Sequence, residues 1–522
     1  MKRITSKFSL LLLLCLLIIS VQKVEITQAN FFPPPEHHSG IYIRNDGSVE
    51  PSSAPIQHTG KVYTLSGDVS IGIAVEKSNV VINGNGYSLQ GNSSGTAFYL
   101  QTVENVTIQN VTVQCFNYGF YLHHCNGSTI KGNEISECGT GVEVTQTSCC
   151  NKILENTIVS STGVSNYMHA DHNIIAENDV TGQGVGISVM WSNNVTIQNN
   201  NVATNTNTNT SGSPFEEQNY GIYLDNSNHG KLYDNTVERN RYGIHFWHCL
   251  NFKLSGNILR DNDCGIQIEG SHSAEILASH KIDTSNTVNG KPVYYLVNQH
   301  DIQVPSNAGW VAAVNCTNIT VQNVTLPPNG YGVLFAYTRN SKITNSSISR
   351  SYCAVMLQES ADCIISRNLL CNSGYCAIYF DETFDCTVTE NVIMDNYCIL
   401  GILHEPERNK LFRNNFIDNE WIGGFDNGRN IWDNGSEGNY WSSYDPRANY
   451  DGVDANGNGI GDTPYIIDSC SDNVDRYPLM NKVNIPTVIP EFPSWTPMLL
   501  LLVTLAVALT IYKRRLHKKS IR

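Results

Sequence analysis

Two carboxylates and a tryptophan occupy the same position in three successive repeats of a sequence pattern. Asp225, Trp247 and Glu269 are 22 residues apart, and each stands four residues after a glycine. On neighbouring strands of one sheet, Asp225 and Glu269 would be about 9.6 Å apart, close to the acid–base separation of an inverting glycosidase. They are therefore the candidate catalytic residues of a polysaccharide hydrolase.

Aromatic side chains stand beside these carboxylates. Tyr223 and His245 lie two residues after the same glycines, so they share the outward face of a strand in which side chains alternate. The ring of Trp247 can stack on a sugar, which makes Tyr223, His245 and Trp247 candidate substrate-binding residues. The alternative is an ordinary solvated sheet face that binds nothing.

A second constellation suits calcium. Asp454, Asn456, Asn458 and Asp462 supply oxygens at positions 1, 3, 5 and 9 of a loop with glycine at position 6. Position 12 is a tyrosine and not the bidentate glutamate of an EF-hand, so the loop resembles a thrombospondin- or dockerin-like half site. A metal-free loop of Asx turns is the alternative.

Two imidazole–thiol clusters have ligands that suit copper. His124 lies between His123 and Cys125, and His248 lies beside Cys249. Other repeats have Ser at the places of Cys125 and Cys249, so cysteines that replace buried turn serines are the alternative to a copper site.

A repeat must position all these residues. The phrase glycine, apolar, any residue, apolar returns every 22 or 23 residues over most of the chain, and the apolar residues alternate as in strands. A period of this length is typical of a solenoid. There is neither a regular leucine ladder nor a helical half, which argues against a leucine-rich repeat. We therefore predict an all-β, right-handed parallel β-helix with about 22 residues per coil.

An asparagine marks a second place in each repeat, where its amide can bond to the asparagine of the next coil. The predicted ladder positions are Asn133, Asn156, Asn178, Asn200, Asn235, Asn257, Asn323, Asn345, Asn368, Asn391 and Asn414. Cys353, Cys376 and Cys398 share another position in successive coils, within disulfide reach, although a ladder of buried thiols is equally compatible.

Changes in composition divide the chain. The predicted parts are a signal peptide (1–29), an irregular N-terminal segment and cap (30–80), the β-helix (81–419) with a loop insertion (203–219) and an interruption (275–315), a Trp/Asn/Gly/Asp-rich C-terminal cap (420–482), a linker (483–495), a transmembrane helix or sorting signal (496–512) and a basic cytoplasmic tail (513–522).

The termini predict export to the outer face of the cell membrane, with the tail in the cytoplasm. Without residues 1–29 and 513–522, 23 basic and 46 acidic residues remain, a net charge of −23 that disfavours nucleic acid as a partner. Export makes glycosylation possible at sequons that include Asn92, Asn105, Asn126, Asn194 and Asn209.

The repeat Gly-Ile-x-Leu followed by Asn-x-Ile-x-x-Asn resembles the NosD family, over about residues 61–480. The resemblance implies a β-helix shared with carbohydrate-binding and sugar-hydrolase domains and with pectate lyases. The blocks at 283–295, 438–441, 459–465 and 477–480 resemble archaeal surface members. Pro490-Glu491-Phe492-Pro493 resembles a Pro-Glu-Phe sorting signal, whose family implies a membrane transpeptidase as partner and a helix that can be cleaved.

Three functions fit these features. We favour a cell-surface protein that binds polysaccharide or extracellular matrix without catalysis, because extended outward columns suit long polymers. The enzyme alternative is a polysaccharide hydrolase or lyase, although the Asn-Thr-Asp, Gly-His-Gly and Arg-Ile-Lys motifs of polygalacturonases are absent. The family name suggests the third, a copper-handling accessory protein.

Overall fold

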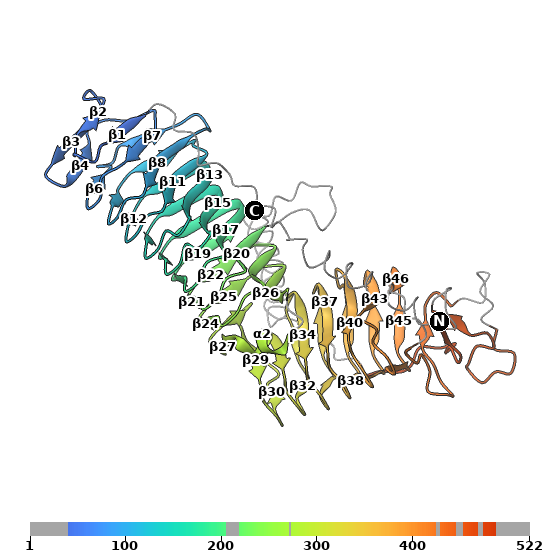
Figure 1. Cartoon of the computed structure of the whole chain (residues 1–522). Coiled ribbons are helices and arrows are strands. Elements are labelled where there is room, and N and C mark those ends of the chain that lie inside the picture. Colours follow the sequence, from blue (N-terminus) through green and yellow to red (C-terminus); the bar gives the residue numbers. More distant parts are fainter. Residues whose placement is uncertain are drawn as a thin grey trace, which may run out of the picture.

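The computed structural model describes residues 40–204, 219–270, 273–423, 429–444, 453–467 and 473–486. These residues form the predicted right-handed β-solenoid, with about 16 turns of about 22 residues. Figure 1 shows two straight arms that meet at an angle near α2 (Ala274–Ser279). We call the described residues of 40–288 the N-terminal arm and those of 291–441 the C-terminal arm.

Each coil of the N-terminal arm contributes strands to three parallel sheets, named I, III and II in chain order. Sheet I contains β8 (Thr96–Gln101), β11 (Tyr118–His123), β13 (Glu134–Thr145), β15 (Thr157–Tyr167), β17 (Asp179–Met190), β20 (Tyr220–Asp225), β23 (Tyr242–Trp247) and β26 (Cys264–Glu269). Sheet III contains β4 (Val62–Leu65), β6 (Val81–Asn83), β9 (Thr107–Gln109), β12 (Thr129–Lys131), β14 (Lys152–Leu154), β16 (Ile174–Ala176), β18 (Thr196–Gln198), β21 (Lys231–Tyr233), β24 (Lys253–Ser255) and β27 (Lys281–Ile282). Sheet II contains β7 (Ser88–Gln90), β10 (Thr112–Gln114), β19 (Asn201–Thr204), β22 (Thr236–Glu238), β25 (Ile258–Arg260) and β28 (Thr287–Val288), and the long strands β13, β15 and β17 also run through it.

The C-terminal arm repeats this arrangement. Its sheet I contains β29 (Lys291–Val297), β31 (Trp310–Val314), β34 (Tyr331–Ala336), β37 (Cys353–Gln358), β40 (Cys376–Asp381), β43 (Cys398–Leu403) and β46 (Trp421–Gly423). Sheet III contains β30 (Gln303–Val304), β32 (Thr320–Gln322), β35 (Lys342–Thr344), β38 (Ile364–Ser366), β41 (Thr387–Thr389) and β44 (Lys410–Phe412). Sheet II contains β33 (Thr325–Leu326), β36 (Ser347–Ser349), β39 (Leu369–Cys371), β42 (Val392–Met394), β45 (Asn415–Ile417) and β47 (Tyr440–Trp441).

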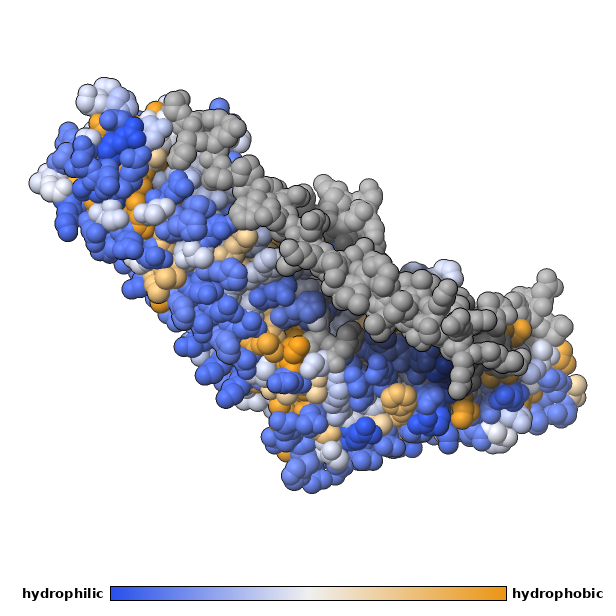
Figure 2. Space-filling view, in the orientation of Figure 1, coloured by the Kyte–Doolittle hydropathy of each residue, from blue (hydrophilic) through white to orange (hydrophobic). Residues whose placement is uncertain are grey.

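Alternating apolar side chains fill the interior of both arms. In sheet III, Ile130 lies in register with Ile108 on one side and Ile153 on the other, and all three are fully buried. Each such side chain contributes about 1.5–3 kcal/mol through burial. The repeated glycine has a steric reason, since a Cβ at Gly221 would lie 2.7 Å from the carbonyl oxygen of Gly243 in the next coil. On the outside, Figure 2 shows mainly hydrophilic side chains with small separate apolar patches.

The asparagine ladder is confirmed in both arms. The amide of Asn178 donates to Asn200 at 3.0 Å and to the Ile153 carbonyl at 2.9 Å, while its oxygen accepts from the amide group of Asn156. The left-handed residue of each turn is the one before the ladder, such as Glu177 with φ 58°.

Two predicted ladder positions are wrong. Asn323 and Asn345 lie one residue early, in the left-handed turn, with φ of 55° and 50°. The ladder passes instead through Ser346, whose backbone N–H donates to Asn368 at 2.9 Å. The prediction failed because asparagine is favourable at both adjacent places of the turn.

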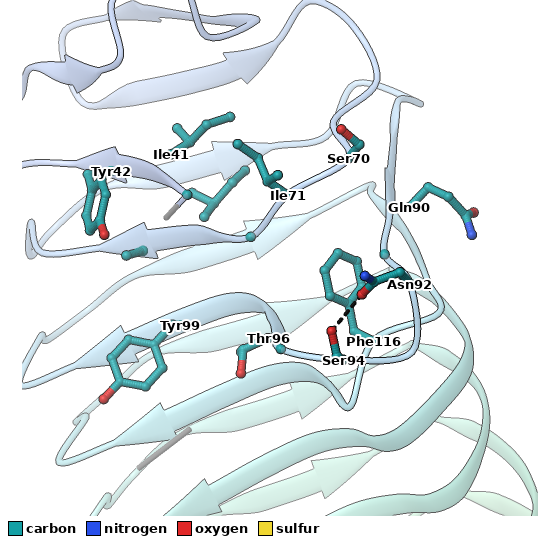
Figure 3. A pocket seen from close by; sticks show the side chains of 16 residues that line it. Ile41, Tyr42, Ser70, Ile71, Gln90, Asn92, Ser94, Thr96, Tyr99 and Phe116 are labelled. Atoms are coloured by element: carbon teal, nitrogen blue, oxygen red, sulfur yellow. Dashed lines mark hydrogen bonds between the residues drawn. The ribbon is translucent and has the colours of Figure 1, made fainter. Parts of the chain in front are cut away.

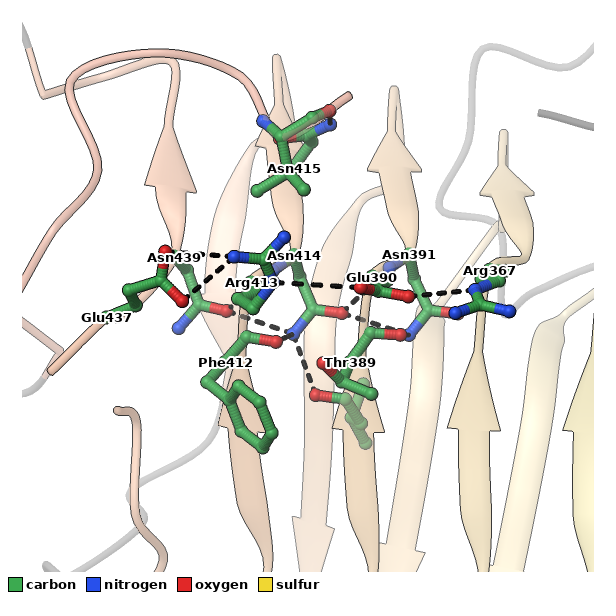
Figure 4. A network of polar contacts seen from close by, with 12 residues as sticks. Arg367, Thr389, Glu390, Asn391, Phe412, Arg413, Asn414, Asn415, Glu437 and Asn439 are labelled. Carbon is green, nitrogen blue, oxygen red and sulfur yellow. Dashed lines mark hydrogen bonds and ion pairs between the residues drawn. The ribbon is translucent and has the colours of Figure 1, made fainter. Parts of the chain in front are cut away.

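The C-terminal arm carries a ladder of charges outside its asparagine ladder (Figure 4). Glu390 lies between Arg367 at 2.8 Å and Arg413 at 3.7 Å, and Arg413 continues to Glu437 at 2.8 Å. These contacts tie successive coils together on the surface.

The bend lies where the parallel pairing of successive strands is interrupted. Strand β28 ends sheet II of the N-terminal arm, and it pairs antiparallel with β29, which begins sheet I of the C-terminal arm. Strand β26 pairs with β23, and no other described strand pairs with it. The outer edge of β26 therefore faces the C-terminal arm, and Asn329 accepts a hydrogen bond from its Ile266 N–H at 2.9 Å.

Both ends of the solenoid are covered. Strands β1 (Ile41–Ile43) and β5 (Ile73–Val75) extend sheet I, β2 (Val49–Glu50) pairs with β1, and β3 (Ile56–Thr59) forms a hairpin with β4. Segment 30–80 thus contains regular strands from residue 41 onward, where the sequence predicted an irregular segment. Its alternating stretches are only about three residues long and lack the repeated glycine phrase, so the sequence pattern gave little signal.

At the other end, β48 (Tyr465–Ile466) pairs with β49 (Val474–Asp475). Two tryptophans of this cap, Trp432 and Trp441, are buried. The indole N–H of Trp441 donates to Asp475 at 2.9 Å, and its ring stacks on Tyr465 at 4.2 Å. Burial raises the pKa of Asp475 to about 6.

Candidate functional site

The predicted column of Asp225, Trp247 and Glu269 exists. The register pairs Asp225 with Trp247 and Trp247 with Glu269 on β20, β23 and β26 of sheet I. Tyr223 and His245 occupy the adjacent column in the same register. The repeat therefore places the five residues on one outward face, as the sequence predicted.

The carboxylate of Glu269 accepts hydrogen bonds from three side chains. His245 Nε2 lies 3.1 Å from one oxygen, while the Gln267 amide and, at 3.4 Å, the Tyr331 hydroxyl donate to the other. Tyr331 belongs to β34, so this last contact joins the two arms. These donors fix the orientation of the Glu269 carboxylate.

Asp225 has a different environment. Its carboxylate accepts from the amide of Asn226 at 2.7 Å, and partial burial raises its pKa. Tyr223 packs against Tyr220 and His245, with ring centroids 4.8 and 5.7 Å away. Burial is also the main cause that raises the pKa of Tyr223. These side chains form an aromatic layer on the N-terminal arm.

A cleft of about 520 Å³ opens where the two arms meet. The N-terminal arm contributes Trp247, His248 and Glu269 to its lining, and α2 contributes Leu277. The residues from the C-terminal arm are Tyr331, Leu334, Tyr352, Cys353, Met356, Gln358, Tyr375, Tyr379, Asp381 and Leu403. Trp247 and Glu269 therefore line this cleft, whereas Asp225, Tyr223 and His245 lie beside it on the same sheet.

Tyrosines of the C-terminal arm form one wall of the cleft. The rings of Tyr352 and Tyr375 stack at 5.1 Å with an interplanar angle of 7°, and Tyr379 lies 6.0 Å from Tyr375. A Cβ at Gly401 would lie 2.4 Å from the ring of Tyr379, so a glycine is needed there for this ring position. We call these three rings the tyrosine platform.

The sequence analysis did not identify this platform. Its signal was present, because Tyr352 and Tyr375 stand one residue before the periodic cysteines Cys353 and Cys376. Those cysteines and Cys398 do share a column, as predicted, and the sulfurs of Cys353 and Cys376 are 3.1 Å apart. The described cysteines are free thiols.

The cleft residue Asp381 belongs to an imidazole–carboxylate pair. His404 Nδ1 lies 2.7 Å from an oxygen of Asp381, which is almost fully buried. This hydrogen bond raises the pKa of His404, which is about half exposed.

The copper candidates lie on separate parts of the N-terminal arm. His124 contacts Thr147 at 3.0 Å, and five coils later in the turn column His248 packs its ring against Trp247 at 5.1 Å. The thiols of Cys125 and Cys249 are buried and directed at backbone carbonyl oxygens. Among the residues that the structure describes, no group of three or more His, Cys, Asp or Glu is arranged to hold a metal ion.

The predicted calcium loop is closed by its own Asx turns. Asp454 accepts backbone N–H bonds from residues 457, 458 and 459 at 2.7–3.0 Å, and Asp462 accepts one from residue 455 at 2.7 Å. Asn456 and Asn458 each accept one from the residue two places on. The loop thus gathers the four side-chain oxygens on one short segment.

The sequons occupy turns of the solenoid. Asn92, Asn105 and Asn194 are exposed, Asn126 is half-buried and accepts from the backbone of Cys149, and Asn209 lies outside the described residues.

A second cavity, of about 420 Å³, lies near the N-terminal end of sheet I (Figure 3). Ile41, Ile71, Tyr99 and Phe116 line it, with a hydrogen bond between Ser94 and Asn92 at its edge. Apart from Asn92, no residue predicted to have a functional role lines it.

None of the described helices is long and apolar enough to cross a membrane. The predicted signal peptide (1–29) and membrane segment (496–512) both lie outside the described residues.

Comparison with known proteins identifies the family. No curated protein matches the chain. Among solved structures, pectate lyase Pel9A is similar at 13% identity and a TM-score of 0.30, covering 48% of this chain and 66% of that enzyme. The A-module of the mannuronan C-5 epimerase AlgE4 of Azotobacter vinelandii is similar at 10% identity and a TM-score of 0.27, covering 69% of this chain and 91% of the module. The family described as periplasmic copper-binding protein (NosD) matches residues 20–167, 161–278, 204–307 and 279–446. The chain therefore belongs to the NosD family.

Proposed function

We propose that this protein binds a polysaccharide in the cleft between its two arms and does not cleave it. The observation that carries the proposal is the lining of that cleft, where the half-exposed indole of Trp247 faces a wall that includes the tyrosine platform. Flat aromatic faces next to a few oriented polar groups are typical of sites that bind polar ligands with apolar ring faces, as sugars have.

The position of the carboxylates favours binding over hydrolysis. A glycosidase pair must flank the same glycosidic bond, but Asp225 does not line the cleft that Glu269 lines. The residues around Glu269 hold it in place, which suits recognition of a ligand hydroxyl or charge. Hydrolysis by Asp225 and Glu269 remains the alternative that the experiment below tests.

The location of the protein forms part of the proposal. Residues 1–29 direct export, and residues 496–512 anchor the chain with its basic tail in the cytoplasm, unless a sorting transpeptidase that recognises the Pro-Glu-Phe motif removes the anchor. The solenoid then presents its cleft outside the cell, where polysaccharides are available.

The test is a panel of insoluble and soluble polysaccharides incubated with the full chain, followed by measurement of bound protein and of released sugar. We expect binding without release, and Trp247→Ala should weaken it by at least about tenfold, as for a central aromatic anchor. Trp421→Ala is the matched control, because Trp421 is 64% exposed at the end of sheet I and does not line the cleft.

Two results would contradict the proposal. Equal binding by the parent and Trp247→Ala would place the ligand elsewhere. Sugar release that disappears in both Asp225→Asn and Glu269→Gln would make the protein a hydrolase.

A further inference from the structure

We propose that the glycan bound in the cleft carries protonated amines, as a polymer of amino sugars with free amino groups does. This inference rests on the proposed function and adds the charge of the ligand to it. The inference follows from the charged groups that line the cleft, from the hydrogen bonds that Glu269 accepts and from the aromatic faces beside it.

First, the charged residues that line the cleft favour a cationic ligand. Glu269 and Asp381 are the carboxylates of this lining, and none of the described lining residues is Lys or Arg. Glu359 and Glu382 follow in the adjoining turns, where Glu359 accepts a hydrogen bond from the Tyr337 hydroxyl at 2.7 Å. The described lining therefore contains two carboxylates, and its one imidazole is that of His248.

The second step concerns Glu269. Its ion-pair partner is His245, which is 5% exposed and has a buried Nδ1 without a hydrogen-bond partner. A protonated His245 would bury an N–H that lacks an acceptor, which is costly. The other two donors, the Gln267 amide and the Tyr331 hydroxyl, are neutral groups. At the surface of the cleft, Glu269 is thus held by side chains that carry no permanent positive charge.

The third step is the chemistry that these groups share. A cation beside the face of Trp or Tyr is attracted by the ring, and a nearby carboxylate adds a direct ionic attraction. Trp247 and the tyrosine platform provide such faces, and Glu269 provides such a carboxylate, whereas the buried Asp381 is already paired with His404. A uronic acid polymer would instead place its own carboxylates against them, which is unfavourable.

The experiment titrates the full chain with three oligosaccharides of equal length and linkage type, at about pH 6, where a sugar amine is largely protonated. They are a β-1,4-linked glucosamine oligomer, its fully N-acetylated form and a β-1,4-linked mannuronate oligomer as the anionic probe. We expect the amine form to bind about tenfold more tightly than the acetylated form at low salt, with the difference shrinking as salt screens it. The anionic oligomer should not bind measurably.

Substitutions of the carboxylates in the cleft test which group causes the preference for the amine form. Glu269→Gln keeps the shape of the side chain and should remove most of the preference for the amine, because it weakens binding of the amine form more than binding of the acetylated form. Asp381→Asn is the second variant, in case the first disturbs the hydrogen bonds of Tyr331. Glu390→Gln, on the charge ladder away from the cleft, should leave both affinities unchanged.

The outcomes separate this inference from the proposed function. Equal binding of the amine and acetylated oligomers, or tighter binding of the uronate, would overturn the inference while glycan binding stands. A preference for the amine that both Glu269→Gln and Asp381→Asn retain would also overturn it. If neither these oligomers nor any polysaccharide of the panel binds, the proposed function itself fails.

Discussion

The two arms have nearly the same interior and different outer faces. In both, asparagines bond from coil to coil with almost the same geometry, since Asn178 and Asn391 each donate to the next asparagine at 2.9–3.0 Å. Outside, sheet I of the N-terminal arm carries Asp225, Trp247 and Glu269, whereas sheet I of the C-terminal arm carries tyrosines above a column of thiols. The repeat specifies the scaffold, and the candidate site depends on the outward residues at the junction of the arms.

The largest expected effect tests the equivalence of the interiors. Asn178→Ala and Asn391→Ala each leave several buried backbone and amide groups without partners, which should cost about 3 kcal/mol in the free energy of unfolding. Denaturant unfolding followed by circular dichroism measures both. Asn345→Gly is the control, because this turn residue lies outside the ladder and glycine tolerates its left-handed φ of 50°, so stability should change by less than about 0.5 kcal/mol. Clearly unequal losses in the two arms would break the comparison.

The next prediction concerns the junction. Burial lowers the pKa of His280, which packs beside Phe252, to about 4. An unfolded histidine binds its proton near pH 6.5, so between about pH 6.5 and 4 the unfolded state holds more protons and stability falls on acidification, by about 3 kcal/mol in total. Thermal unfolding across this range measures the loss, and His280→Gln should remove most of it.

His404 provides a control of opposite sign. Its pKa is raised by Asp381, so its stabilisation is complete below about pH 6.5 and is lost as the pH rises through the raised value. His404→Gln should therefore flatten the profile on the neutral side and leave the acid loss. An acid profile that His280→Gln does not change would show that other groups dominate the junction.

The third prediction concerns calcium binding by the C-terminal cap. Calcium bound by Asp454, Asn456, Asn458 and Asp462 should raise the unfolding temperature, with a stabilisation of about 2.7 kcal/mol at a concentration 100 times the dissociation constant. The double variant Asp454→Asn, Asp462→Asn keeps acceptors for the turns and should lose the response to calcium. Identical responses of parent and variant would leave the loop as a set of Asx turns.

The smallest expected effect compares ion pairs on the outer surfaces of the two arms. Glu390 bridges Arg367 and Arg413 on the C-terminal arm, whereas Glu155 of the N-terminal arm pairs with Lys131 at 3.0 Å. Glu390→Gln should cost up to about 1 kcal/mol and Glu155→Gln less than about 0.5 kcal/mol, because exposed single pairs contribute little. Both losses, measured by thermal unfolding, should shrink in high salt. An equal cost at the two sites would mean that the ladder adds nothing beyond isolated pairs.

The sequence predicted the coil and the register well. Because side chains repeat every 22 residues, the column of Asp225, Trp247 and Glu269 followed from spacing alone, and the strands confirm it. The bend did not follow, because it depends on the antiparallel pairing of β28 with β29, which has no periodic signal. The contact between Tyr331 and Glu269 was equally hidden, since the two residues are 62 positions apart and meet only because of the bend.

The nearest-neighbour construction of the arms also bears on how such proteins diverge. Each coil contacts mainly the coils before and after it, so insertion or loss of a whole repeat far from α2 leaves the junction unchanged. Every added coil would move the tip of an arm by about 4.8 Å. Relatives with longer or shorter arms can therefore keep the same junction at different distances from the ends of the solenoid.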